Sequence, residues 1–352
     1  MLMSVKENLR SLWRAGMRVP VGAMAMAAVL YGCGGGASSP EGPATALPEE
    51  KPVTLPITKM PASSYSGFKQ EAFERLNEAR IAAGVSAVKQ NAQLDAAAQA
   101  HAEYLAGNYV TGHYEDPAKP LFTGYGHNDR AKAQGYPNYV KSEIITSFYS
   151  IATGRDHIGF HLNSVYHLAA AMDPAANEIG IGVSETSKPA RYIPSSFTFG
   201  TTDRRLLPVE PVWVWPVDGA SRVPRGFIAA SESPNPLPDL APDTTVTVGA
   251  PIMFCGSRNN NAALEITHLR FIESASQIAP KARVLHHRLT KVQNISGMEA
   301  REDPNMSALS YSHCVFILPL DELAVDRAYT VSLTALQGGA RVEKRWSFTT
   351  AP

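Results

Sequence analysis

The chain has 352 residues, of which 44% are hydrophobic and 18% charged, a composition that is typical of a globular protein and excludes a wholly disordered chain. At roughly 150 residues per domain, this length predicts about two domains. Lysine plus arginine and aspartate plus glutamate each total 32, so the sequence has no basic excess of the kind that binds a phosphate backbone. We therefore expect no nucleic acid partner.

A short hydrophobic run, Val19–Leu30, lies near the start of the chain between several basic residues and the pair Gly32 and Cys33. Its 12 residues fall well short of the ~20 that span a bilayer, so it predicts a secretion signal over residues 1–32. The end of the run resembles the lipobox of bacterial lipoproteins, in which the signal is cut before a cysteine that then carries lipid. The resemblance implies a membrane anchor at Cys33, and Gly34 after it favours the outer membrane. The alternative is a plain signal peptide followed by a free cysteine.

Ten of the 28 residues from Gly34 to Pro61 are glycine or proline, which predicts a disordered tether over residues 33–64. The sequence then becomes rich in alanine, with apolar residues at helical spacing. Helices are predicted up to Gly84, over Leu94–Leu105, from Asn128 to Gly135, over Ser142–Ile151 and over Gly159–Ala171. Alternating apolar residues predict strands over Glu178–Ser184 and Tyr192–Thr201. Helices followed by strands indicate a layered α/β or α+β domain over residues 65–207.

The remaining residues, 208–352, have the pattern of a β domain. Apolar runs occur at Val246–Cys255, Leu264–Ile272 and Cys314–Leu318, and two alternating segments flank Gly338 and Gly339 as in a hairpin. These runs predict an all-β, immunoglobulin-like sandwich. The tryptophans Trp213 and Trp215 near the junction are expected to pack the two domains together.

If Cys33 carries lipid, Cys255 and Cys314 remain as an even pair in an oxidising compartment. They would form one disulfide, and their spacing suits a bridge between the two sheets of the sandwich. Two buried free thiols are the alternative.

Histidine is the residue type that stands out as a candidate for chemistry. Six of the ten histidines fall between residues 101 and 167: His101, His113, His127, His157, His161 and His167. Imidazole is both a metal ligand and a proton shuttle near neutral pH, so this clustering favours a functional site. The sequence contains none of the common zinc-protease, redox-dithiol, dinucleotide, phosphate-loop or serine-hydrolase motifs.

The order of short motifs along residues 65–203 resembles a known family. The motifs are Leu76, Asn77 and Arg80; Leu94, Ala98 and His101; Gly112 and His113; Phe122 to Gly124; Asp129 to Ala131; Gly135 and Tyr136; Glu143; Ser164, Tyr166 and His167; and Gly180 to Gly182. Together they resemble the bacterial branch of the CAP superfamily of cysteine-rich secretory, antigen 5 and pathogenesis-related proteins. The resemblance implies an α/β/α sandwich with a central antiparallel sheet and a surface cleft lined by two histidines and acidic residues.

Carried over residue by residue, the resemblance makes His113 and His167 the two cleft histidines and Glu143 the cleft glutamate. Glu143 is flanked by Ser142 and Ile144, where relatives have glycine and asparagine. Glu115 is the candidate for a second cleft acid. Two imidazoles and a carboxylate would hold zinc or another divalent metal with an open position, and without metal they would serve as a general acid and base pair.

Of the other histidines, His101, His157 and His161 each have two possible interpretations. His101 is a candidate binding residue, but it lies on an apolar helix face and is better explained as a hydrogen-bonded core histidine. His157 and His161 either face solvent or line the rim of the cleft. His286 and His287 are expected to be exposed in the β domain.

The sequence is compatible with three functions. The leading one is an extracytoplasmic, lipid-anchored CAP-domain protein whose cleft binds a small-molecule, lipid or peptide ligand, with or without a divalent metal. The second is a hydrolase of peptidase or esterase type that uses His113, Glu143 and His167. The third is an envelope adhesion or scaffold protein in which the β domain makes the contacts.

Overall fold

The computed structural model describes residues 55–148, 153–186, 191–202, 211–257, 262–295 and 297–352. The predicted signal, Cys33 and most of the predicted tether lie outside the described residues. The described residues all belong to one compact unit. Within the described part of the chain, no helix combines the length and the apolar character needed to cross a lipid bilayer.

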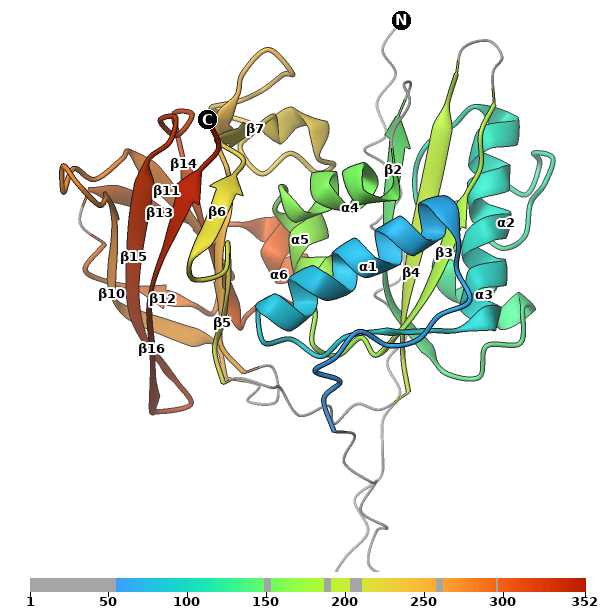
Figure 1. Cartoon of the computed structure of the whole chain (residues 1–352), viewed down its shortest axis with the longest axis horizontal. Coiled ribbons are helices and arrows are strands. Elements are labelled where there is room, and N and C mark those ends of the chain that lie inside the picture. Colours follow the sequence, from blue (N-terminus) through green and yellow to red (C-terminus); the bar gives the residue numbers. More distant parts are fainter. Residues whose placement is uncertain (1–54, 149–152, 187–190, 203–210, 258–261, 296) are drawn as a thin grey trace, which may run out of the picture. The chain divides into compact units, whose positions relative to one another are not determined.

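The N-terminal half is a four-stranded sheet between two layers of helices. Its elements are α1 (Gly67–Ala82), β1 (Lys89–Gln90), α2 (Ala92–Asn108), α3 (His127–Ala133), β2 (Tyr139–Phe148), α4 (Gly154–Leu162), α5 (Tyr166–Ala171), β3 (Glu178–Val183) and β4 (Ile193–Thr201). The strand order is β1-β3-β4-β2, with β4 antiparallel to both β3 and β2. Figure 1 shows α2 on one side of this sheet and α1 and α4 on the other. The predicted α/β/α sandwich is therefore confirmed.

Alternation along β3 explains how both helix layers fit against the sheet. A Cβ atom added to Gly182 would lie 2.1 Å from the carbonyl oxygen of Ala98 in α2, so glycine lets the helix backbone lie directly on this face. Ile179 and Ile181 point to the opposite face, where they join the apolar core formed with α1, α4 and α5. The same strand therefore carries a helix on each side.

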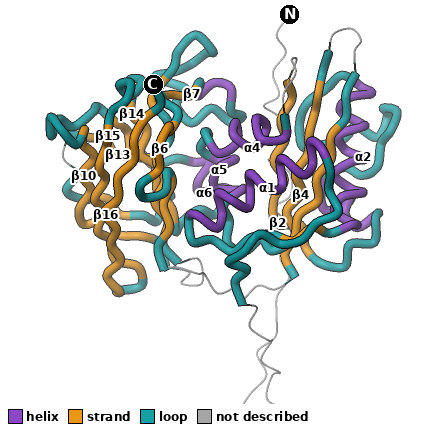
Figure 2. The backbone as a smooth tube through the Cα atoms, viewed as in Figure 1, coloured by secondary structure: helices purple, strands orange, loops and turns teal. Residues whose placement is uncertain are grey.

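The C-terminal half contains two five-stranded sheets packed face to face (Figure 2). One sheet has the order β12-β10-β15-β16-β6 and the other the order β13-β11-β14-β9-β5. Their bounds are β5 (Trp213–Trp215), β6 (Ala220–Val223), β9 (Ile252–Cys255), β10 (Leu264–Glu273), β11 (Ala282–His286), β12 (Lys291–Val292), β13 (Met298–Glu302), β14 (Cys314–Pro319), β15 (Ala328–Gln337) and β16 (Ala340–Thr350). A short pair, β7 (Gly226–Phe227) and β8 (Val248–Gly249), and a helix, α6 (Pro304–Ala308), complete this part. The predicted β-sandwich is confirmed.

The sheet that contains β14 is buried on both faces. Val315 and Ile317 belong to the core between the two sheets, whereas Phe316 and Leu318 belong to the core that also contains residues of α1, α4 and α5. Trp213 of β5 joins this second core, as expected for a residue that packs the two halves together. One face of the β-sandwich therefore belongs to the same hydrophobic core as the helices α1, α4 and α5.

Two secondary-structure predictions for the N-terminal half are wrong. The predicted helix over Ser142–Ile151 is strand β2 as far as Phe148, where its residues pair with β4. The β-branched run Ile144, Ile145 and Thr146 suits a strand, and the pairing with β4 decides the outcome. The predicted helix over Gly159–Ala171 is two helices, since α4 ends at Leu162 and α5 begins at Tyr166.

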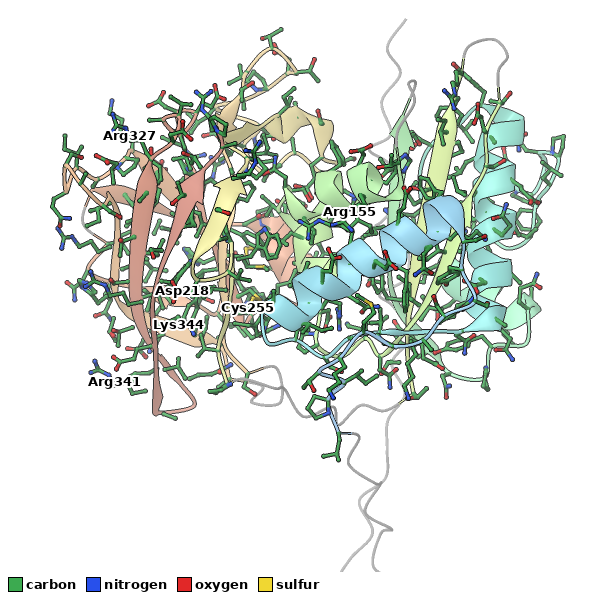
Figure 3. The ribbon with its side chains drawn as sticks, in the orientation of Figure 1. Arg155, Asp218, Cys255, Arg327, Arg341 and Lys344 are labelled. Atoms are coloured by element: carbon green, nitrogen blue, oxygen red, sulfur yellow. A yellow bond between two sulfur atoms is a disulfide. The ribbon has the colours of Figure 1, made fainter. Side chains whose placement is uncertain are left out.

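The Cys255–Cys314 disulfide is present, but it does not connect the two sheets. The two cysteines are paired directly on neighbouring strands β9 and β14 of one sheet, with their Cα atoms 4.1 Å apart. Cys255 is labelled in Figure 3. The spacing of 59 residues specifies a loop length and not which strands become neighbours. His287, predicted to be exposed, is buried, and its Nδ1 accepts a hydrogen bond from the Leu289 amide.

Candidate functional site

The most exposed of the predicted cleft histidines is His113, which lies in the loop after α2. Its side chain is 40% exposed, and its Nδ1 lies 3.1 Å from a carboxylate oxygen of Glu143. Glu143 is on β2 and its side chain is 1% exposed. The structure therefore brings together two of the three residues that the resemblance assigned to the site.

The Glu143 carboxylate is held from three sides. Arg130 of α3 donates from Nη2 to both oxygens, at 2.8 and 2.9 Å, and Ser196 of β4 donates from Oγ at 3.0 Å. Arg130 also donates from Nη1 to the carbonyl oxygen of His113 at 3.1 Å. The guanidinium of Arg130 therefore fixes both the Glu143 carboxylate and the backbone of His113.

These contacts determine the charge of Glu143 and the proton position on His113. Burial alone would raise the pKa of the Glu143 carboxyl, but the hydrogen bond from His113 and the charges of Arg130 and His101 lower it far below its ordinary value. An ionised carboxylate only accepts hydrogen bonds, so Nδ1 of His113 is the donor. In the neutral ring, Nε2 is then left with its lone pair.

His101 and Glu115, both candidate binding residues, are buried and hold the loop that carries His113. His101 Nδ1 lies 2.8 Å from a Glu115 oxygen and Nε2 lies 3.0 Å from the Gly112 carbonyl oxygen. Each ring nitrogen therefore lies at hydrogen-bond distance from a protein oxygen, so neither is free for a ligand. Glu115 also accepts from the Thr123 and Gly124 amides, at 2.6 and 3.3 Å. This placement matches the core interpretation of His101.

The second predicted cleft histidine, His167, is oriented by a carboxylate that the sequence did not point to. Its Nδ1 lies 2.8 Å from Oε1 of Glu232, which belongs to the segment after β7. Glu232 is buried and also accepts from the backbone amides of Val165, Tyr166 and His167, at 2.8, 2.7 and 2.9 Å. His167 remains 15% exposed at its side chain. Its orientation therefore depends on a residue 65 positions further along the chain.

His161 is fully buried, and its ring lies 5.0 Å from that of His167 between ring centroids. Nε2 shares a hydrogen bond with Thr146 of β2, and Nδ1 has no hydrogen-bond partner among the described residues. Burial, and then the charges of His167, His157 and His113, lower the pKa of His161 well below its ordinary value. His161 therefore stays neutral at physiological pH.

His157 is also buried, with Nδ1 2.7 Å from the Ser195 hydroxyl, and burial lowers its pKa to about 4. Of the two alternatives for His157 and His161, exposure to solvent is wrong for both, because α4 presents them to the sheet.

Edge strand β2 connects the two halves of the site. Glu143 on β2 binds His113, while Thr146 on β2 contacts His161, which neighbours His167. His113 and His167 are not in direct contact, and no three His, Cys, Asp or Glu side chains in the described part of the chain gather closely enough to hold a metal ion. Both Glu143 oxygens are engaged by Arg130, so Glu143 supports His113 and is not placed as a third ligand.

Two tyrosines and a further histidine lie near His113. Tyr114 and Tyr125 are 65% and 60% exposed, and their rings stack with centroids 4.9 Å apart. His127 is the first residue of α3. Burial lowers the pKa of its ring, the charge of Glu143 raises it, and the charge of Arg130 lowers it, so that the net shift is downward. The histidine-rich stretch contained the signal for His127, but no local pattern signalled Glu232.

The four-stranded sheet between two helix layers is the α/β/α architecture expected of a CAP domain. A family model, CAP, described as the cysteine-rich secretory protein family, matches residues 73–195. The chain therefore carries a CAP domain.

Similar solved structures include an outer surface protein from Borrelia burgdorferi, with 18% identity and a TM-score of 0.32 over 38% of this chain and 92% of that one. They also include an extracellular protein containing an SCP domain from Bacillus anthracis, with 16% identity and a TM-score of 0.30 over 37% of this chain and 39% of that one. No curated protein matches the chain.

Proposed function

We propose that this protein is an extracytoplasmic, lipid-anchored CAP-domain protein that binds a ligand through His113 and His167. The observation that carries the proposal is the half-exposed ring of His113, whose Nδ1 is bonded to a buried, ionised carboxylate. The His167 side chain is 15% exposed, and its Nδ1 likewise lies 2.8 Å from a buried carboxylate oxygen, that of Glu232. In both residues the carboxylate occupies Nδ1, so Nε2 is the atom that meets a ligand.

The location outside the cytoplasm is supported by two observations. A disulfide within the folded core is typical of proteins from oxidising compartments. The matched family is described as one of secretory proteins. The anchor at Cys33 rests on the sequence, and replacing Cys33 with serine is expected to abolish incorporation of a labelled fatty acid. Incorporation that survives in Cys33→Ser would contradict the anchor.

The chemistry of the donor atoms suits a divalent metal held by Nε2 of His113 and His167. Metal-binding histidines commonly donate their other ring nitrogen to a carboxylate, which fixes the ring and raises its basicity. A bound metal would supply a Lewis acid with open positions for the ligand. The stacked rings of Tyr114 and Tyr125 would add an apolar contact surface beside His113.

Calorimetric titration of the purified chain with Zn²⁺ tests this proposal. We expect one site in the wild type and a loss of at least tenfold in affinity in both His113→Ala and His167→Ala. His286→Ala, in the β-sandwich, is the matched control and should bind as the wild type does. Zinc binding that is absent in the wild type, or unchanged in either cleft variant, would contradict the proposal.

The His113–Glu143 pair also favours a hydrolase as a second candidate, because a histidine backed by an ionised carboxylate is the arrangement of a general base. Turnover of a peptide or ester library, abolished in His113→Ala, is the expected result for this candidate. The same turnover in the His113→Ala, His167→Ala double variant would exclude it.

A further inference from the structure

Arg75, on α1, is a half-buried guanidinium for which the described part of the chain provides no hydrogen bond or ion pair. Burial and the nearby charge of Arg155 lower its pKa, while the charge of Glu78 raises it. Arginines that lose water are normally paired, since an unpaired charge in a partly buried position costs free energy. Arg75 is therefore a partly buried charge without an acidic or hydrogen-bonding partner among the described residues.

The acid that would pair with Arg75 is already engaged. Glu78, also on α1, accepts two hydrogen bonds from Arg155 of α4, at 2.8 and 3.3 Å. Figure 3 shows Arg155 beside α1. Because Glu78 is paired with Arg155, its negative charge does not balance the positive charges of both Arg155 and Arg75.

Arg75 lines a cavity of about 310 Å³ between α1 and the segment that contains β5 and β6. Trp215, Ala82 and Val217 provide apolar walls, and Arg222 adds a second positive charge to the lining. Among the lining residues, Glu78 is the one acid, and it is paired as described above. The cavity thus combines an apolar interior, an aromatic ring and an unpaired guanidinium.

We propose that this cavity binds a small carboxylate with a ring-bearing apolar body, with the carboxylate on Arg75 and the ring against Trp215. A guanidinium matches a carboxylate in shape and charge and binds it through two parallel hydrogen bonds. The volume lies at the lower end of the range for small-molecule sites, about 300–1,000 Å³, and suits a compound of one or two rings. Neither His113 nor His167 lines the cavity, so this site is separate from the one proposed above.

Calorimetry with 2-naphthoate, and with 2-naphthalenemethanol as its neutral counterpart, tests the proposal on the full chain. We expect one site for 2-naphthoate and at least tenfold weaker binding of the alcohol. Arg75→Gln should weaken 2-naphthoate about tenfold and leave the alcohol unchanged, which is the loss expected for one charged hydrogen-bonding partner. Arg341→Gln, an exposed arginine of β16, is the matched control and should bind 2-naphthoate as the wild type does.

A second variant separates the charge effect from a folding effect. Glu78→Gln removes the nearby negative charge, so it should bind 2-naphthoate more tightly than the wild type, by a few fold. The proposal is overturned if 2-naphthoate fails to bind at millimolar concentration, if the alcohol binds equally well, or if Arg75→Gln, with an unchanged melting temperature, binds as the wild type does. Because these readouts do not involve His113, their failure leaves the zinc titration of the other site unaffected.

Discussion

Replacing Glu232 should destabilise the CAP domain although this residue lies outside the matched family region. Its carboxylate accepts three backbone hydrogen bonds at the start of α5 and one from Nδ1 of His167. Glu232→Ala removes every one of these acceptors and leaves the donors in a buried place. The perturbation therefore acts on α5 and on the orientation of His167 together.

The magnitude follows from the number of donors. A buried donor without an acceptor costs about 1–3 kcal/mol. Water that enters the space left by the side chain would recover part of this cost. The four donors therefore predict that Glu232→Ala lowers the free energy of unfolding by about 4 kcal/mol. Glu232→Gln keeps one acceptor oxygen. If that oxygen stays with the Tyr166 and His167 donors, the Val165 amide then faces an NH₂ group, and the predicted loss is about 2 kcal/mol.

Urea unfolding followed by circular dichroism measures these losses. Glu322→Gln is the matched control, because Glu322 makes a half-exposed ion pair with Arg225 at 3.6 Å, and such pairs contribute about 0–1 kcal/mol. If Glu232→Ala lowers the free energy of unfolding by no more than the control does, the structural role assigned to Glu232 is incorrect. Because Glu232 lies within residues 208–352, deleting these residues would also remove the carboxylate that orients His167. Such a truncation would therefore not test an adhesion function separately from the candidate site.

Three further predictions concern stability. Burial lowers the pKa of His157 to about 4, so as the pH falls below ~6.5 the unfolded chain takes up a proton at this residue before the folded chain does. The free energy of unfolding should therefore drop between pH 6.5 and 4, by about 3 kcal/mol from this residue. A urea midpoint that is constant over this range would contradict the burial of a neutral His157. Reducing Cys255–Cys314 should cost about 4 kcal/mol on the chain-entropy model for a 59-residue separation, measured by unfolding with and without reductant; equal midpoints would refute this. Gly182→Ala places a Cβ 2.1 Å from the Ala98 carbonyl oxygen and should cost about 2 kcal/mol or more by the same assay, whereas wild-type stability would show that α2 can move away.

Elements with a strong local pattern could be predicted from the sequence. The stripe from Leu94 to Leu105 repeats at helical spacing and is α2, and the alternation in Glu178–Val183 is β3. The hairpin around Gly338 and Gly339 is β15 and β16. In these cases local propensity and burial favour the same structure, so the sequence pattern suffices.

Elements decided by distant partners could not be predicted in this way. Residues Ser142–Phe148 have apolar side chains that suit either a helix or a strand, and pairing with β4, about 50 positions away, selects the strand. The disulfide was predictable from the cysteine count, but the neighbouring positions of β9 and β14 depend on how the whole sheet is assembled.

The site shows the same division. His113 and Glu143 were predicted from the family resemblance, and the structure places them in contact. Arg130 was predicted as part of the motif Asp129 to Ala131, and its salt bridge to Glu143 became visible in the structure. Glu232 had no signal, because its role exists only once the chain has brought the segment after β7 to the start of α5.

Buried carboxylates are expected to fix His113 and His167 with the proton on Nδ1 and the lone pair on Nε2. Nitrogen-15 NMR of the imidazole rings at a pH where both are neutral measures this directly. We expect the Nδ1–H tautomer for both residues, with the preference of His113 lost in Glu143→Gln and that of His167 retained. An Nε2–H tautomer at either histidine in the wild-type protein would contradict it.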